Sequence, residues 1–589
     1  MKIFDAYISP ATLGFFQQNL SSETSLEVAN TLVHSISGIQ FFFERTTDLE
    51  EFQKNLSELY NFVEEPDRAE YGDFQTSLDL AIAVTNYLSK HVDEPDVVIE
   101  PTCGKGNFIL AAIKTFKSIN KVYGIEIYRP YVWEAKFSII DFFLATPHAN
   151  KPDICIYHNN VFDFNFNAIA SEISTQNILV IGNPPWVTNS MLGSLNSSNL
   201  PVKSNFKKHN GLDAITGKGN FDIAEYITMM MLDTFQNKNG TIALLVKSSV
   251  IKNIIFDQKK NKYYIGDIEK HCIDSRKEFN VSVDAALFFC RLNVPPSFNC
   301  HEFDFYNNLE SHLCFGWVEE KFVSNIKTYV HSKHIDGNCP FEWRQGLKHD
   351  CSAVMELDKV NNHYINALNE EWELECDLVY GILKSSDLKN TVIKAPRKYT
   401  IVTQRKVGQD TSYIRSSFPK TYQYLVNHQD SFNARKSSIY KNKPSFSIFG
   451  IGDYSFKPFK VVISGLYKTF HFTLVLPENQ KPLMLDDTCY MLGFDNLDYA
   501  LYSLILLNSQ TTKELLQSIT FSDAKRTFTK DILMRIDLFK LSKQMSLSEV
   551  IQEIESFNMR YSLNSTANNW HSFVDLLRPV QSGQIAMFV

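Results

Sequence analysis

The chain contains 589 residues, more than one hydrophobic core normally organises, so two or three domains are expected. Hydrophobic residues make up 44% and charged residues 21% of the sequence, as in ordinary soluble globular proteins, and the net charge is -8. The ten cysteines include no CxxC pair, which argues against a zinc knuckle and a secreted disulfide framework, and no metal site is predicted.

The first 70 residues form an acidic segment in which helices are predicted. Residues 1–100 carry 18 Asp or Glu against 5 Lys or Arg, and Glu64-Glu65-Pro66 ends the segment. Met1 to Gln18 lacks a basic start followed by an apolar run. The most apolar stretch of the chain, residues 499–507, is too short to span a bilayer. We therefore expect a cytoplasmic protein with no membrane partner.

Short apolar runs alternate with helical stretches between residues 77 and 292, which is typical of an α/β domain with a mostly parallel sheet. Pro295-Pro296 follows this pattern and predicts a domain boundary. The predicted strands are Val97–Glu100, Val122–Glu126, Ile154–Tyr157, Ile178–Gly182, Ile242–Val246 and Ala285–Leu292. The predicted helices are Leu78–Leu88, Asn107–Thr115, Pro130–Phe143, Asp222–Phe235 and, much later in the chain, Leu497–Ile519.

Glycines and acidic residues follow the first three predicted strands. The turn Cys103-Gly104-Lys105-Gly106 lets a ligand approach the backbone closely. A dinucleotide fingerprint would need a third glycine where Ile109 stands, which argues against a nicotinamide cofactor. Glu126 is placed to accept hydrogen bonds from two ribose hydroxyls, and Asp163 from an adenine amino group. The order of these residues predicts a site for a cofactor that contains a nucleoside.

The tetrapeptide Asn183-Pro184-Pro185-Trp186 follows the fourth predicted strand. An aromatic amine is a poor nucleophile because its lone pair is delocalised into the ring. The Asn183 side-chain oxygen and the Pro184 carbonyl can accept the two amino protons and favour a localised lone pair. The two prolines fix φ and lack N–H donors, so the loop is stiff and rich in acceptors. Trp186 offers a flat face on which an extruded base can stack.

Together these motifs resemble those of the amino-group DNA methyltransferases, especially the adenine-N6 enzymes of restriction–modification systems. Ser77 departs from the family, which usually has proline at that position. The cofactor motifs precede the catalytic motif and the variable region is C-terminal, which resembles the gamma arrangement. The matching segments are Tyr71-Gly72-Asp73-Phe74-Gln75-Thr76, the Cys103 to Gly106 turn, Glu126, Asp163, the NPPW tetrapeptide and Gly219-Asn220-Phe221-Asp222.

The resemblance implies a Rossmann-like class I methyltransferase domain over residues 71–296. A small N-terminal helical segment (1–70) would precede it, and a target-recognition region (297–589) would follow it. The resemblance also implies S-adenosylmethionine as the cofactor and the N6 amino group of a flipped-out adenine as the methyl acceptor. The implied catalytic residues are Asn183, Pro184, Pro185 and Trp186, and the implied base-stacking residues are Trp186 and Phe279. The implied cofactor contacts are Phe74, Gln75, Thr76, Glu100, Pro101, Cys103, Gly104, Gly106, Phe108, Glu126, Ile127, Asp163, Phe164 and Asn183.

The C-terminal half carries a basic block. Residues 381–470 hold 16 Lys or Arg against 4 Asp or Glu, interleaved with aromatic residues. Such an excess predicts a surface for a polyanion, and the resemblance makes double-stranded DNA the expected partner. The 70-residue front end is too short for a nuclease domain, so any restriction endonuclease or defence-system subunit would be a separate partner. The expected DNA contacts are Arg397, Lys398, Arg405 and Lys406.

Three other functions stay open on the sequence. Asn183 followed by an aromatic at the fourth position resembles adenine-N6 enzymes more than cytosine-N4 enzymes, which more often begin with Ser. Similar loops occur in methyltransferases for protein glutamine or RNA guanine, but those lack so large a basic module. A non-catalytic DNA-binding defence subunit could retain the fold, although the intact glycine, acidic and NPPW positions argue against it.

Overall fold

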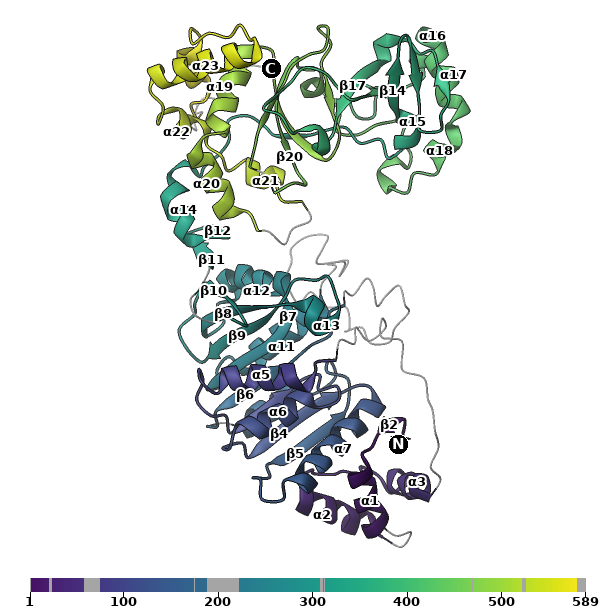
Figure 1. Cartoon of the computed structure of the whole chain (residues 1–589), viewed down its shortest axis with the longest axis vertical. Helices are drawn as coiled ribbons and strands as arrows, with labels where there is room; N and C mark the ends of the chain where they lie inside the picture. Colours follow the sequence, from purple (N-terminus) through teal and green to yellow (C-terminus); the bar gives the residue numbers. More distant parts are fainter. Residues whose placement is uncertain are drawn as a thin grey trace. The chain divides into compact units, whose positions relative to one another are not determined.

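The computed structural model divides into two compact units, Met1–Phe322 and Val323–Val589 (Figure 1). It describes residues 2–20, 24–57, 75–173, 175–187, 222–307, 311, 313–468, 470–521 and 526–579. None of the helices in these ranges is both long and apolar enough to cross a membrane.

The first unit is built on a ten-stranded sheet with the order β12-β11-β10-β8-β9-β7-β6-β3-β4-β5. Strands β5, β4, β3, β6 and β7 are parallel to one another, and β9 lies antiparallel between β7 and β8. All six predicted strands are confirmed. The bounds are β3 (Val97–Glu100), β4 (Lys121–Glu126), β5 (Asp153–His158), β6 (Ile178–Gly182), β7 (Gly240–Lys247), β8 (Ile265–Ile273) and β9 (Ala285–Leu292).

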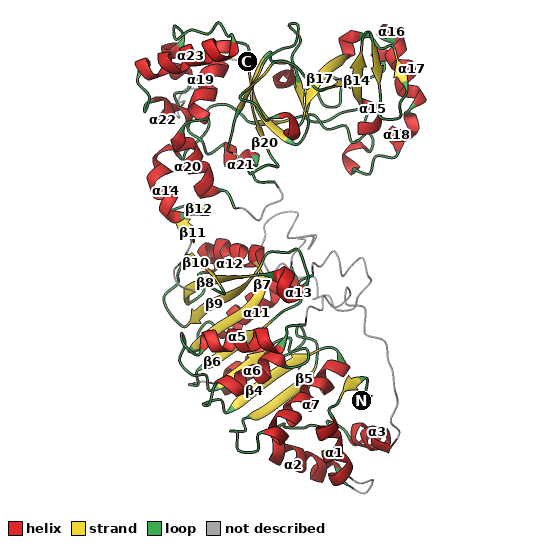
Figure 2. Cartoon of the chain, in the orientation of Figure 1, coloured by secondary structure: helices red, strands yellow, loops and turns green. Residues whose placement is uncertain are grey.

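Helices cover both faces of this sheet, which explains why every residue of β3 and β6 is buried. Figures 1 and 2 show α5, α6 and α7 together on one face, and α8 and α12 both contact α11. Ser77 caps α5 by accepting a hydrogen bond from the Leu80 N–H at 3.2 Å, so the residue that replaces the family's proline starts the helix. The bounds are α5 (Leu78–Leu88), α6 (Asn107–Thr115), α7 (Arg129–Ala145), α8 (Phe166–Glu172), α11 (Ile223–Phe235) and α12 (Ser248–Asn261).

The sheet continues past Pro295-Pro296, where the sequence predicts a boundary. β10 (Asn299–Asp304) pairs in parallel with β8, and β11 (Leu313–Val318) pairs antiparallel with β10. β12 (Lys321–Val323) ends the sheet. The first unit therefore ends at residue 322 instead of 296, because these strands cover an edge of β8 that would otherwise be unpaired.

The acidic N-terminal segment is part of the first unit. The described part contains the hairpin of β1 (Lys2–Ile3) and β2 (Ala6–Tyr7) and the helices α1 (Pro10–Asn19), α2 (Leu26–Ser37) and α3 (Thr46–Ser57). Between α2 and α3, Gln40 N–H donates to the Ile154 carbonyl at 2.7 Å, so the segment extends the sheet beside β5.

An aromatic cluster joins this segment to α7. Phe42 is fully buried, and its ring lies 5.3 Å from Trp133 and 6.3 Å from Phe137 of α7. Lys136 of α7 donates to the Phe42 carbonyl at 2.9 Å, and burial lowers the pKa of Lys136 to about 8. The N-terminal segment therefore packs against the outer face of α7.

The second unit contains a five-stranded sheet (β13-β23-β20-β21-β18) and a six-stranded sheet (β16-β15-β14-β19-β17-β22). Its strands are β13 (Arg344–Gln345), β14 (Glu356–Val360), β15 (His363–Ile365), β16 (Glu371–Trp372), β17 (Val379–Leu383), β18 (Val392–Ile393), β19 (Lys398–Ile401), β20 (Phe459–Ser464), β21 (Thr473–Val475), β22 (Met484–Leu485) and β23 (Cys489–Phe494). Its helices are α14 (Ile326–Ser332), α15 (Ser352–Met355), α16 (Tyr413–Ser417), α17 (Pro419–Asn427), α18 (Gln429–Asn433), α19 (Leu497–Leu507), α20 (Gln510–Ile519), α21 (Lys530–Leu533), α22 (Leu538–Ser542), α23 (Leu547–Tyr561) and α24 (Trp570–Leu576).

The helix predicted over residues 497–519 is two helices, α19 and α20. Ser509 separates them, because its side chain caps α20 by accepting a hydrogen bond from Thr512 N–H at 3.3 Å. Hydrophobic periodicity alone did not reveal this break.

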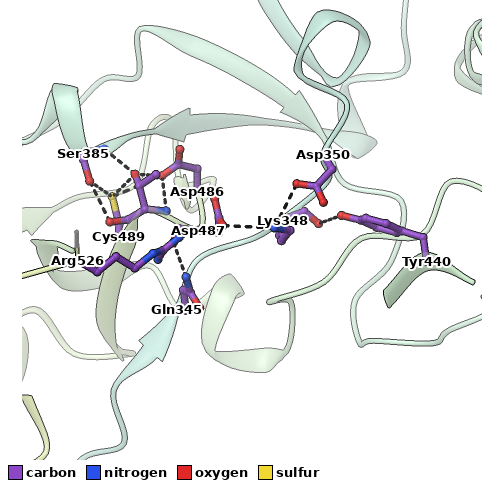
Figure 3. A network of polar contacts seen from close by, with 10 residues as sticks. Gln345, Lys348, Asp350, Ser385, Tyr440, Asp486, Asp487, Cys489 and Arg526 are labelled. Carbon is purple, nitrogen blue, oxygen red and sulfur yellow. Dashed lines mark hydrogen bonds and ion pairs between the residues drawn. The ribbon is translucent and has the colours of Figure 1, made fainter. Parts of the chain in front are cut away.

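A polar network at the turn between β22 and β23 fastens distant segments of the second unit (Figure 3). Asp487 lies between Arg526, at 3.4 Å, and Lys348, at 3.9 Å. Ser385, which follows β17, donates to the Thr488 carbonyl at 2.9 Å. These contacts join the ends of both sheets to the segment that follows α20.

We expect Phe42→Ala to lower the free energy of unfolding of the first unit by about 3–5 kcal/mol, because it leaves a cavity among buried rings. Phe41→Ala is the matched control, since the neighbouring Phe41 is 71% exposed and its loss should change stability by at most about 0.5 kcal/mol. Calorimetric unfolding of the full chain measures both. Equal shifts for the two variants would contradict the proposed packing.

Candidate active site

The predicted site residues of the first unit gather at one edge of its sheet. Parallel strands place their carboxyl ends on the same side, so the loops after β3, β4 and β6 lie next to one another. The strand order reverses between β3 and β6, which is where open α/β sheets bind ligands. Phe74, Tyr71–Asp73 and Gly219-Asn220-Phe221 lie outside the described residues.

Glu126 links two of these loops. One of its carboxylate oxygens accepts a hydrogen bond from Gly104 N–H at 2.9 Å, and the other from Tyr128 N–H at 2.8 Å. Glu126 therefore organises the backbone of the site.

Two glycines in the turn after β3 adopt positive φ, 51° at Gly104 and 78° at Gly106. A Cβ atom at Gly104 would lie 2.8 Å from the Gln75 side-chain oxygen, and one at Gly106 would lie 3.0 Å from the Ala135 Cβ. The Gln75 oxygen also accepts a weak hydrogen bond from Lys105 N–H at 3.4 Å. The turn is therefore packed from below by α7 and from the side by the segment that precedes α5.

Glu100 ends β3 and is only 2% exposed. Burial raises the pKa of its carboxyl well above the usual value, and the nearby negative charge of Glu126 acts in the same direction. The Oε2 atom of Glu100 and the Oγ1 atom of Thr102 are buried and form no hydrogen bond. Buried polar atoms of this kind are costly unless a ligand supplies the missing partner.

A hydrogen bond to Thr76 holds Asn183 beside the glycine turn that follows β3. The Asn183 amide nitrogen donates to the Thr76 hydroxyl at 3.2 Å, and the Asn107 amide nitrogen donates to the Thr76 carbonyl at 2.8 Å. The structure thus brings the predicted residues Thr76 and Asn183 together. These contacts fix the start of the NPPW loop against the first turn of α6.

Trp186 is 5% exposed, and its indole N–H donates to the Leu245 carbonyl of β7 at 3.2 Å. Its ring meets Phe279 edge to face, with centroids 5.0 Å apart. Phe279 is half-buried at the end of the short helix α13 (Ser275–Phe279). The two rings predicted to stack on a base are therefore neighbours that contact each other.

The remaining predicted positions differ in how accessible they are. Asp163 is exposed on the turn after β5, and Phe164 and Ile127 are half-buried. Pro101, Cys103 and Phe108 are buried, and burial raises the pKa of the Cys103 thiol. The Phe108 ring belongs to the core, so its side chain supports the turn from inside.

Two polar residues of the site, Glu134 and Lys247, were not singled out from the sequence. The Lys105 ammonium forms an ion pair with Glu134 of α7 at 2.9 Å, and Glu134 also accepts from Tyr7 N–H of β2 at 3.2 Å. At the other end of the NPPW loop, Lys247 pairs with Asp222 at 2.5 Å, and Ile223 N–H donates to the Val187 carbonyl. Such partners become visible only in the tertiary structure, because the residues of each pair are far apart in the sequence. Among the described residues, no group of three or more His, Cys, Asp or Glu is arranged to hold a metal ion.

The raised pKa of Glu100 predicts a pH dependence of stability. Below about pH 4.3 the carboxyl is protonated in both the folded and the unfolded state, so its burial has no ionisation cost. As the pH rises, the unfolded chain ionises first, and stability falls by about 1.4 kcal/mol for each pH unit until the folded pKa is reached. Glu100→Gln removes this loss.

We therefore expect the stability of Glu100→Gln relative to the original chain to increase with pH above about 4.3. Denaturant titrations of the first-unit transition at several pH values measure it. Glu50→Gln, at an exposed position of α3, is the control and should show no such trend. A constant difference between Glu100→Gln and the original chain at every pH would count against a protonated Glu100.

Comparison with known proteins identifies the family. No family model matches the sequence. The type II methyltransferase M.NspV of Nostoc sp. is 40% identical over 486 residues, which cover 81% of this chain and 98% of that relative. Among solved structures, the type IIL restriction–modification enzyme MmeI in complex with DNA matches 96% of this chain and 89% of its own, with a TM-score of 0.52 and 13% identity.

The similarity to MmeI shows a shared fold, and the strand order of the first unit is that of the predicted Rossmann-like class I methyltransferases. The similarity to M.NspV extends over most of both chains and confirms the resemblance inferred from the motifs. The chain belongs to the DNA methyltransferases of restriction–modification systems.

Proposed function

We propose that this chain transfers a methyl group from S-adenosylmethionine to the N6 amino group of an adenine flipped out of double-stranded DNA. The observation that carries the proposal is the placement of Asn183. It lies at the carboxyl edge of the sheet and is hydrogen-bonded through Thr76 to the glycine-turn region. A loop that orients an aromatic amine thus lies beside a loop suited to a nucleoside cofactor.

The residues at the sheet edge fit this cofactor. The carboxyl group of Glu126 is of a kind that accepts hydrogen bonds from ribose hydroxyls, and the buried Oε2 of Glu100 and Oγ1 of Thr102 have no hydrogen-bond partner. The glycine turn allows close approach to the backbone. Bound there, S-adenosylmethionine supplies an electrophilic methyl group on a positively charged sulfur. The residues that would hold it are Gln75, Thr76, Gly104, Gly106, Glu126, Ile127, Asp163 and Phe164.

The NPPW loop would activate the base without a covalent intermediate. The Asn183 side-chain oxygen and the Pro184 carbonyl would accept hydrogen bonds from the two N–H groups of the amino group, which favours a localised nitrogen lone pair. The hydrogen bond from the Asn183 amide nitrogen to Thr76 restricts how that amide turns. Acceptors already held in place need little reorganisation during the reaction, which is the main source of their catalytic effect.

Trp186 and Phe279 would hold the extruded base. The Trp186 ring is fixed along one edge by its hydrogen bond to β7, whereas Phe279 lies half-buried at a helix end. Because the two rings contact each other edge to face, a base that stacks on the side of Trp186 where Phe279 lies would displace Phe279. We expect Phe279 to be the ring that moves.

The first prediction of this proposal concerns Glu126. Glu126→Ala leaves two ribose hydroxyls without their acceptor, so affinity for S-adenosylmethionine should fall by about 1.5–3 kcal/mol. Calorimetric titration measures it, with Glu50→Ala as a control that should bind normally. Unchanged affinity would mean that the nucleoside lies elsewhere.

The second prediction concerns Asn183. Asn183→Ala should keep binding of cofactor and DNA near normal, but lower the single-turnover methylation rate at least about a hundredfold, since the lost acceptor acts chiefly in the transition state. Asn167→Ala, at an exposed position of α8, is the matched control. Mass spectrometry of the product nucleosides distinguishes N6-methyladenine from N4-methylcytosine. A near-normal rate for Asn183→Ala, or methylcytosine as the product, would refute the mechanism.

A further inference from the structure

Residues 403–411 of the second unit form a loop that is anchored at both ends. Thr403 and Thr411 are buried, and their hydroxyls donate to the Phe446 carbonyl at 2.7 Å and the Ser445 carbonyl at 2.6 Å. The Tyr413 hydroxyl donates to the Thr403 carbonyl at 3.1 Å. Both ends of the loop are thus tied to one neighbouring segment.

The side chain of Gln404 fixes the interior of the loop. It is 0% exposed, accepts a hydrogen bond from Ile448 N–H at 2.9 Å and donates to the Gln409 carbonyl. The Gln409 side-chain oxygen in turn accepts from Arg405 N–H at 2.8 Å. Because the Gln404 and Gln409 side chains form hydrogen bonds with backbone groups of the loop, its conformation is restricted. Residues 405–408 are exposed. At Gly408, φ is +79° and a Cβ atom would meet nothing within 4 Å.

Arg405 and Lys406 are exposed on this loop. The Arg405 guanidinium lies 4.1 Å from the centre of the Phe456 ring. In the part of the chain that the structure describes, neither residue forms an ion pair with an acidic side chain, and the Arg405 guanidinium makes no hydrogen bond. The other two predicted DNA contacts differ, since Arg397 pairs with Asp387 at 3.3 Å and Lys398 with Asp358 at 3.1 Å.

This contrast separates two kinds of basic residue. Arg397 and Lys398 already have carboxylate partners that would compete with phosphate. Arg405 is a charged, planar donor group whose orientation is restricted by stacking on a ring and whose five N–H groups are available. Presenting such a group on a rigid loop lowers the entropy lost on binding.

We propose that the loop 403–411 reads the target sequence, and that Arg405 binds the O6 and N7 atoms of a guanine in the major groove. This inference rests on the proposed function, since it takes double-stranded DNA as the substrate. Bidentate arginine–guanine pairing is the commonest specific contact between proteins and base edges, and it requires a planar fork held in a defined orientation. Lys406 lies beside it and contacts a neighbouring phosphate.

The test is selection of bound duplexes from a random pool by the full chain and by Arg405→Ala, Arg405→Lys and Arg578→Ala. The original chain should enrich a sequence that contains a G·C pair. Arg405→Ala should lower the preference at that one pair by about tenfold or more, and Arg405→Lys should restore it only partly, because lysine keeps the charge but not the fork. Arg578→Ala, at an exposed arginine that pairs with Asp575 and lies outside the basic block, is the control and should leave every position unchanged.

The salt dependence of binding separates a base contact from a phosphate contact. Arg405→Ala should keep the log–log salt slope of non-specific binding, whereas loss of one phosphate contact would reduce it by about 0.9. Any of three results would overturn the inference. The salt slope of Arg405→Ala falls while its base preference is unchanged, its preference is lost at a pair other than G·C, or the original chain enriches no sequence. The selection measures binding alone, so methylation of cytosine, or of nothing, by a chain that still shows the Arg405 effect would refute the proposed function and not this one.

Discussion

The hydrogen bonds from Gly104 and Tyr128 to the Glu126 carboxylate hold together the sheet edge on which the proposed function depends. They join the loop after β3 to the loop after β4, so a side chain at the end of one strand sets the backbone of the next. Burial raises the pKa of the nearby Glu100 carboxyl, and the negative charge of Glu126 acts in the same direction. The edge thus holds two carboxyl groups in different surroundings, since that of Glu126 accepts backbone hydrogen bonds and that of Glu100 is buried without a partner for its Oε2 atom.

The N-terminal segment supports this edge from behind. Its aromatic cluster packs on α7, and α7 lies against the glycine turn so closely that a side chain at Gly106 would meet Ala135. The ion pair of Lys105 with Glu134, and the hydrogen bond of Glu134 to Tyr7, continue this support at the surface. Two acidic residues of the N-terminal segment, Asp48 and Glu51, pair with Arg129 of α7 and so join the segment to that helix.

In the second unit, the basic residues of the block 381–470 differ in their surroundings. Some cations are bound within the unit, as Arg397 is by Asp387, and others stack on rings, as Arg405 does on Phe456. Outside this block, Arg526 and Lys348 share Asp487 at the turn between β22 and β23. Counting charges locates the basic region, but the partners decide which charges remain available to a polyanion.

The sequence by itself determined the parallel strands and the positions of the motifs at their ends, because an apolar run bounded by glycine or proline is a local signal. Val97–Glu100 and Ile178–Gly182 have the predicted bounds for this reason. Glu126 and Asn183 were singled out the same way, since Glu126 ends β4 and Asn183 directly follows β6. The family resemblance also followed from these local motifs.

Only the tertiary structure decided features that depend on partners far away in the chain. The first unit ends at residue 322, whereas a boundary was predicted at 296, because β10 pairs with β8. A local pattern does not reveal such strand pairing. The break between α19 and α20 depended on the cap at Ser509. The contact of Trp186 with Phe279 and the different surroundings of Arg397 and Arg405 arise from packing between segments that the sequence keeps apart.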